Sequence, residues 1–166
     1  MKADQSAIRS AVITLLAAWL VHDIEEACTL PATSKVISAR LGTPRVQVSP
    51  AQSTLAIALM GLLVTGACTR GIHTSGDSRF FRLVLAGLEA HVLTHVVASV
   101  ILTRYTAGLI TAPLVMLPGA RTARAAVRRE GTPLTLGDTV RGTALMFSAA
   151  LTCHLIARVA LPSPPA

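Results

Sequence analysis

Residues 51–69 read A-Q-S-T-L-A-I-A-L-M-G-L-L-V-T-G-A-C-T, a run of nineteen residues without a charged side chain. A helix rises 1.5 Å per residue, so a helix of this length crosses most of the roughly 30 Å hydrocarbon core of a bilayer. Pro50 comes directly before the run, where the first turn of a helix tolerates proline. The stretch predicts a transmembrane helix, and the rest of the chain is interpreted around it.

The composition of the whole chain agrees with a membrane protein. Of 166 residues, 52% are hydrophobic and only 14% are charged, and the mean hydropathy is +0.60. An ordinary soluble domain of this size carries more charge. The net charge is +7, but the arginines are dispersed between apolar blocks, with no aromatic platform beside them. This pattern favours membrane lipid over nucleic acid as the partner of the basic residues.

Four more apolar stretches lie on either side of this run. They predict an all-α fold, a single domain over residues 1–166 that forms an integral membrane bundle of five transmembrane helices. Pro31 is expected to stop the first helix, and Pro113 and Pro118 are expected to kink the fourth. The predicted spans are residues 8–30, 51–69, 83–103, 105–120 and 142–161.

The basic residues predict the orientation of these spans. Cytoplasmic loops carry an excess of Lys and Arg, and ten of the fifteen basic residues fall on the side of the N-terminus. We therefore expect the N-terminus in the cytoplasm and, because the number of spans is odd, the C-terminus outside. The ten are Lys2, Arg9, Arg70, Arg79, Arg82, Arg121, Arg124, Arg128, Arg129 and Arg141.

The first span ends in the sequence His22-Asp23-Ile24-Glu25-Glu26. Side chains three and four residues apart share one face of a helix, so His22, Glu25 and Glu26 converge. Asp23 is turned about 100° from His22 and is expected to lie outside the cluster. An imidazole beside two carboxylates can bind a cation, or the two carboxylates can share a proton.

More polar residues occur in the third and fifth spans. His91 and His95 lie one helical turn apart, a spacing that suits joint metal ligation, and His154 lies in the fifth span. Glu89 lies on the opposite face from His91, where we expect an ion pair with Arg82. The histidines fall at similar depths, and each ionisable group there costs roughly 2.5–3.5 kcal/mol. One shared polar centre would explain why they occur together.

The chain resembles a bacterial integral membrane family that is named for its H-x-x-E-E motif. The motif is His22-Asp23-Ile24-Glu25-Glu26, His95 follows in the third span, and residues 105–113, Y-T-A-G-L-I-T-A-P, resemble the family's Y-x-P-G-x-x-T-A segment. Two positions depart from the pattern, because His91 stands where an Asn is expected and Ala107 replaces the proline. The resemblance implies the membrane fold, a bacterial cytoplasmic membrane and a suspected enzymatic role of unknown kind.

Three functions are compatible with these residues. In the first, a divalent transition metal such as zinc, iron or manganese is bound, because imidazole and carboxylate ligands suit such metals. The chain would then be an enzyme with hydrolase or oxidoreductase chemistry on a lipophilic small-molecule substrate. The candidate ligands are His22, Glu25, Glu26, His91, His95 and His154, with Glu25, Glu26 and His22 also the candidate catalytic residues.

The second function is a metal-free isomerase or cyclase, in which a carboxyl and a histidine act as acid and base on a hydrophobic substrate. The third is a small carrier that relays protons or ions through the same residues. Five helices form only a thin bundle, so a homodimer that covers one face is a further expectation.

Overall fold

The computed structural model describes residues 5–162, which contain helices and no strand. The helices are α1 (Gln5–Leu41), η1 (Pro44–Val46), α2 (Pro50–His73), α3 (Arg79–Leu102), η2 (Ala112–Met116), α4 (Leu117–Arg129) and α5 (Leu136–Ala160). The all-helical prediction is confirmed. Four of these helices, α1, α2, α3 and α5, are long and apolar enough to cross a membrane.

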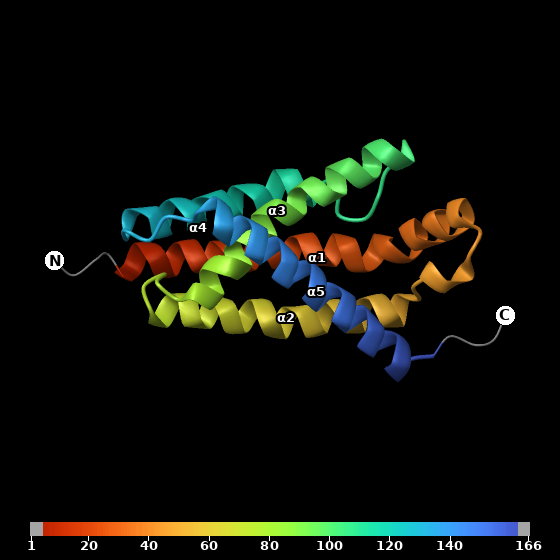
Figure 1. The fold of residues 1–166 in the computed structure, drawn as a ribbon, viewed down its shortest axis with the longest axis horizontal. Helices are drawn as coiled ribbons and strands as arrows, with labels where there is room; N and C mark the ends of the chain where they lie inside the picture. Colours follow the sequence, from red (N-terminus) through yellow and green to blue (C-terminus); the bar gives the residue numbers. More distant parts are fainter. Residues whose placement is uncertain (1–4, 163–166) are drawn as a thin grey trace.

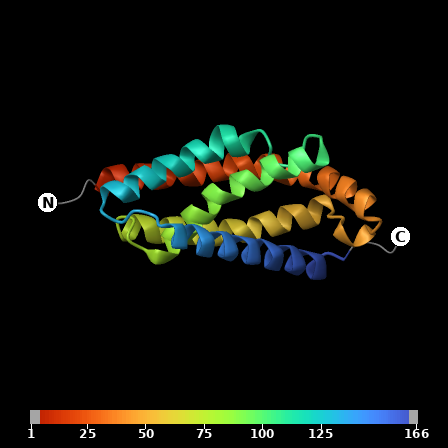
Figure 2. The ribbon, with the colours of Figure 1, turned by 45° about the horizontal axis from the view of Figure 1, so that its top comes forward.

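The helices form an elongated bundle whose members run in alternating directions (Figure 1). α1, α3 and α5 run one way along the bundle, whereas α2 and α4 return, so α1 begins and α5 ends at opposite ends (Figures 1 and 2). The basic residues predicted on one side gather at the end where α1 begins. Lys2, which was counted among them, lies outside the described residues.

The helix starts follow local capping rules. Ser49 accepts a hydrogen bond from the Gln52 amide, and the Gln52 side chain accepts one from the Ser49 amide, which completes a capping box at the start of α2. Thr135 and Asp138 form the same arrangement at the start of α5. The predicted run 51–69 is thus one helix with a defined start, and it extends to His73.

The first helix does not stop at Pro31 as expected, but continues to Leu41 with the proline inside it. A proline within a helix removes one backbone hydrogen bond. The second half of α1 is held by other contacts: Ser34 Oγ accepts a hydrogen bond from the Val48 amide, and Ser38 Oγ donates to the Thr43 carbonyl. These bonds tie α1 to the connection around η1, which offsets the loss at Pro31.

The fourth predicted span differs most from the structure. Residues 105–110 are not helical, and helix begins only at Thr111, directly before the π-helical turn η2, which α4 follows. Gly108 has φ +73°, and Pro113 and Pro118 each lie at the start of a helical piece, where proline costs least. The fourth pass through the bundle therefore begins with a short, mostly non-helical segment and continues as helix. We refer to residues 105–111 as the strap.

Two buried stripes lead from the core to the polar residues. On α1 the stripe is Ile8, Val12, Leu15, Trp19 and then His22, and on α3 it is Phe81, Leu85, Leu88, Val92 and then His95. Both stripes follow the alternating spacing of three and four residues that one face of a packed helix shows. The packing that forms the core therefore also brings His22 towards His95.

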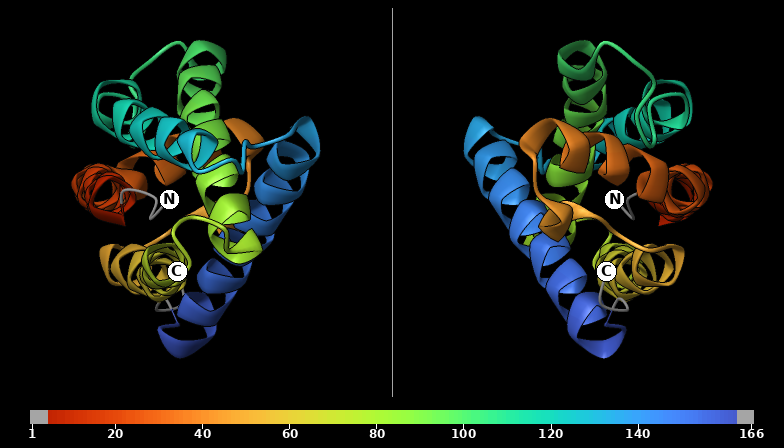
Figure 3. Two further views of the ribbon diagram at one scale, coloured as in Figure 1. Left: turned by 90° about the vertical axis from the view of Figure 1, so that its left-hand side faces the viewer. Right: turned by 90° about the vertical axis from the view of Figure 1, so that its right-hand side faces the viewer.

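α5 lies on the flank of the bundle beside α2 and α3 (Figure 3). It meets α3 at Gly87 and Gly142, where an added Cβ atom on Gly142 would lie 2.2 Å from the Leu83 carbonyl oxygen. This close backbone contact requires glycine. Beyond the crossing, residues of α1, α2, α3 and α5 line a cavity of about 280 Å³, which we call the inner cavity.

Candidate metal centre

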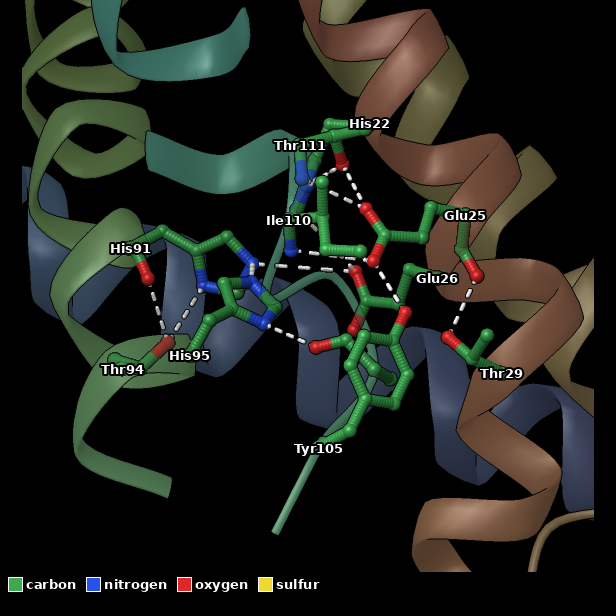
Figure 4. A network of polar contacts seen from close by, with 11 residues as sticks. His22, Glu25, Glu26, Thr29, His91, Thr94, His95, Tyr105, Ile110 and Thr111 are labelled. Atoms are coloured by element: carbon green, nitrogen blue, oxygen red, sulfur yellow. Dashed lines mark hydrogen bonds and ion pairs between the residues drawn. The ribbon is translucent and has the colours of Figure 1, made fainter. Parts of the chain in front are cut away.

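Four side chains from two helices converge in the middle of the bundle (Figure 4). His22 and Glu26 come from α1, and His91 and His95 come from α3. One nitrogen or carboxylate oxygen of each lies within 4.8 Å of those of the other three. Each helix thus contributes two ligand-type groups at the i, i+4 spacing that the sequence indicated.

The imidazole of His22 is fixed by Thr111, the last residue of the strap. His22 Nδ1 lies 3.0 Å from Thr111 Oγ1, and the Thr111 hydroxyl donates its own hydrogen to Glu25. The Thr111 oxygen must therefore accept from His22 Nδ1–H. The opposite nitrogen, Nε2, then carries a lone pair, and it is fully buried without a hydrogen-bond partner.

The same geometry recurs at the other two histidines. His95 Nδ1 lies 2.7 Å from the Ala107 carbonyl oxygen, which can only accept, so Nδ1 carries the hydrogen. His91 Nδ1 lies 3.2 Å from Thr94 Oγ1, whose hydrogen is already donated to the His91 carbonyl. All three histidines thus hold Nδ1 as a donor and turn an Nε2 lone pair towards the centre. Metal-ligating histidines typically have this arrangement.

The distances between the ligand atoms fit a single cation. His95 Nε2 lies 2.8 Å from His91 Nε2, and Glu26 Oε2 lies 3.8 Å from His22 Nε2 and 4.0 Å from His91 Nε2. Bonds of 2.0–2.2 Å in a tetrahedral zinc site place neighbouring ligand atoms about 3.3 Å apart. The observed separations lie on both sides of this value, so a transition metal fits with small side-chain adjustments.

Glu25 does not point into this group but holds the strap against α1. Its carboxylate accepts hydrogen bonds from the Tyr105 hydroxyl, the Thr111 hydroxyl, the Ile110 amide at 3.2 Å and the Thr111 amide at 2.8 Å. Glu25, expected among the ligands, therefore lies outside the group of four and has this anchoring position instead. Non-helical backbone at membrane depth needs such partners, because no water is available there to satisfy its polar groups.

Gly108 lets the strap pass close to the histidine rings. A Cβ atom at this position would lie 2.5 Å from His22 Cε1 and 2.8 Å from His95 Cε1. Its positive φ is also unfavourable for any residue with a side chain. The glycine therefore allows the strap to cover the two imidazoles while Ala107 and Thr111 bond to them.

The inner cavity reaches the centre from the side of Glu26 and His91, both of which line it. Asp23 lies outside the group of four, as expected. It is not turned away from the site, however, because it also lines this cavity and is only 7% exposed. α1 is covered by α2 on one side and by α4 on another, so a rotation of 100° still leaves Asp23 inside the protein. His154 lies on the wall of the same cavity, outside the group of four.

Glu89 pairs with a different arginine from the one expected. Its Oε2 lies 2.5 Å from Arg124 Nη1 of α4, while Arg82 contacts Asp77 at 3.4 Å. The α3 and α4 helices pack together, and this tertiary contact overrides the alignment of Glu89 and Arg82 along one helix. Glu89 is not one of the four converging residues, as expected.

Sequence reasoning gave Tyr105, Gly108 and Thr111 no role in the candidate site, although it singled out the segment that contains them. Their positions in Y-x-x-G-x-x-T match their functions here: Tyr105 and Thr111 bind Glu25, and Gly108 makes room for the histidines. Spacing within residues 105–113 could not show this, because Glu25 and His22 lie eighty or more residues earlier in the chain.

Comparison with known proteins gives a family but no activity. The sequence model of a family described as "Protein of unknown function with HXXEE motif" matches residues 13–123, which is well over half of the chain. No curated protein and no solved structure shows significant similarity to this chain. The matched range contains all four converging residues and the whole strap. The chain therefore belongs to the family of proteins of unknown function that carry the HXXEE motif.

Proposed function

We propose that this protein is a membrane-embedded, metal-dependent enzyme that acts on a lipophilic substrate. The observation that carries the proposal is the set of three imidazoles whose Nδ1 atoms are all held as donors, so that three Nε2 lone pairs face Glu26. Without a cation, the 2.8 Å contact between His91 and His95 would oppose two lone pairs unless one ring took up a proton.

The mixed ligand set indicates the class of metal. Imidazole nitrogens with one carboxylate suit zinc, iron or manganese, whereas calcium and magnesium prefer a shell of oxygens. When bound, such a metal acts as a Lewis acid towards a carbonyl, phosphoryl or water oxygen. The three free cysteines are Cys28, Cys68 and Cys153, and none of them belongs to the group.

The surroundings of the group support a hydrophobic substrate. The inner cavity is lined mainly by apolar side chains, including Trp19, Met60, Leu88 and Met146, and its polar groups are few. Ligand sites in proteins are typically apolar cavities with a small number of placed polar groups. In the proposed enzyme Glu26 and His91 face the reacting end of the substrate, and the strap shields the opposite side of the centre.

The metal-free isomerase is kept as a second candidate because of Asp23. Its carboxyl group lines the inner cavity close to Glu26, is nearly buried and has no hydrogen bond among the described residues. A buried carboxyl beside a histidine can serve as acid and base without any metal. The two candidates differ in whether the purified protein binds a transition metal.

The test is the metal content of protein purified in detergent, followed by titration of the chelated protein with zinc, iron(II) and manganese(II). We expect about one equivalent of one of these metals in the wild type, and loss of binding in His22→Ala and Glu26→Ala. His73→Ala is the matched control, because His73 lies at the end of α2 outside the group. A folded wild-type protein that binds none of the three metals would contradict the proposal and favour the isomerase.

A further inference from the structure

A second cavity adjoins the inner one, and we call it the outer cavity. Its volume is about 370 Å³, and it is lined by residues of the η1 connection, α2 and α5. Phe147, Ala150 and His154 line both cavities. The two spaces therefore meet along one face of α5.

The far end of the outer cavity carries two positive charges. Arg45 and Arg158 line it, and none of its described lining residues is acidic. The Arg158 guanidinium donates to the carbonyl oxygens of Arg45 and Gln47. These bonds fix one cation at the mouth, whereas the Arg45 side chain is exposed and makes no hydrogen bond or ion pair among the described residues. Paired arginines are well suited to binding phosphate or carboxylate groups.

Between the two arginines and the junction with the inner cavity, the wall of the outer cavity is apolar and open to lipid. Phe147, Leu151 and Leu155 line the outer cavity and are 73%, 53% and 55% exposed. α5 is also the least buried of the four long helices. From Phe147 to Arg158 the helix rises about 16 Å at 1.5 Å per residue. A hydrocarbon chain can therefore reach this face directly from the bilayer.

We propose that the two cavities together bind one single-chain anionic amphiphile. Its head group, a phosphate or carboxylate, lies between Arg45 and Arg158, and its chain follows α5 past Ala150 and His154 to Glu26 and His91. The assignment of this amphiphile as the substrate rests on the proposed function. The substrate would then react at the end of its chain that is distant from the head group. His154 then belongs to the substrate passage and not to the ligand set.

Trp19 allows a direct binding experiment, because it is the single tryptophan of the chain, is 5% exposed and lines the inner cavity. The protein is placed in nanodiscs of zwitterionic lipid and treated with chelator. It is then titrated with an alkyl phosphate that carries bromine at the end of its chain. We expect saturable quenching of Trp19 fluorescence, since the brominated end must reach the inner cavity.

Charge variants test the head-group site. Arg45→Gln should weaken the binding of the bromoalkyl phosphate by about threefold to fivefold, the effect of one exposed ion pair, and Arg45→Glu should weaken it more. Arg104→Gln is the matched control, since Arg104 does not line the outer cavity. A bromoalkyl trimethylammonium should quench less in the wild type. Equal quenching by both probes, unchanged in Arg45→Glu, would overturn the proposal.

Two further experiments test whether the site requires the chain of the ligand and whether the chain passes from one cavity into the other. Inorganic phosphate at the same concentration as the probe should leave the quenching unchanged, because binding requires the chain. If inorganic phosphate displaces the probe, the site binds free phosphate instead. Ala150→Phe, which fills the junction of the cavities, should abolish quenching while the protein still melts cooperatively, and persistent quenching would contradict the passage.

The quenching titration tests the amphiphile site separately from metal binding. The titration is made on chelated protein, and Arg45→Gln should bind zinc as the wild type does. Quenching without any metal binding would support the amphiphile site and contradict the proposed metalloenzyme. Metal binding without selective quenching would support the proposed metalloenzyme and contradict the amphiphile site.

Discussion

His22 Nδ1 and Thr111 Oγ1 lie 3.0 Å apart although 89 residues separate them in the chain. This contact joins the helix that carries the HXXEE motif to the strap, and through the Thr111 hydroxyl it connects His22 to Glu25. The motif is thus divided between two tasks. His22 and Glu26 face the candidate metal, while Glu25 holds the segment that orients His22.

The first prediction concerns Thr111. Thr111→Val removes the acceptor for His22 Nδ1–H and should lower zinc affinity about 10-fold to 100-fold, the usual effect of losing such an orienting partner. Thr111→Ser should restore most of the affinity, because it retains the hydroxyl. The measurement is competition with a chromophoric chelator. Thr122→Val is the control, since Thr122 bonds only to the Pro118 carbonyl of its own helix, and equal affinities in both Val variants would refute the orienting role.

The second prediction uses a pair of glycines with positive φ. Gly108→Ala should destabilise the protein more than Gly131→Ala does, as measured by thermal unfolding in detergent. Both changes incur the left-handed backbone cost of roughly 1–2 kcal/mol. Only at Gly108 would the new methyl group meet the His22 and His95 rings, since a Cβ atom added at Gly131 would meet no other atom within 4 Å. Equal melting temperatures in the two variants would show that the strap does not lie against the imidazoles.

The third prediction separates the two glutamates of the motif. Glu25→Ala leaves four donors of the strap without their acceptor and should lower the stability of the metal-free protein by about 3 kcal/mol or more. Glu26→Ala should change the stability of the metal-free protein little, but should remove metal-dependent stabilisation. Melting temperatures with chelator and with zinc test both statements. The assignment fails if Glu25→Ala loses only the response to zinc.

The fourth prediction concerns the partner of Glu89. A double-mutant cycle of Glu89→Gln and Arg124→Gln should give a coupling energy of about 1 kcal/mol, because the two side chains are 2.5 Å apart and partly buried. The corresponding cycle of Glu89→Gln with Arg82→Gln should give a value near zero. Chemical unfolding of the single and double variants provides the energies. A larger coupling with Arg82 would restore the pairing expected from the sequence.

The fifth prediction is the orientation in the membrane. Because α1 and α5 run in the same direction, reporters fused at the two ends of the chain should lie on opposite sides of the bilayer. The distribution of arginines places the N-terminal reporter in the cytoplasm. Labelling of intact cells with an impermeant reagent should therefore reach a tag after Ala166. Labelling of both ends, or of neither, would require an even number of crossings.

Local periodicity along the chain was enough to predict the long helices and the pairing of polar residues within each of them. Uncharged runs such as 51–69 defined the long helices, because burying backbone in lipid requires helix and an apolar surface. The i, i+4 spacings of His22 with Glu26 and of His91 with His95 placed each pair on one face, as the helices of the structure confirm. Sequence also indicated that these polar groups share a place in the bundle.

The neighbours that these residues meet depend on contacts between segments that are distant in the chain. Glu25 and Glu26 are adjacent and chemically identical, yet one binds the strap and the other faces the histidines, because the packing of α1 against residues 105–111 is a long-range contact. The partner of Glu89 and the position of Asp23 depend in the same way on where α4, α2 and α5 lie. Helical phase gives the direction of a side chain, but its surroundings are set by segments distant in sequence.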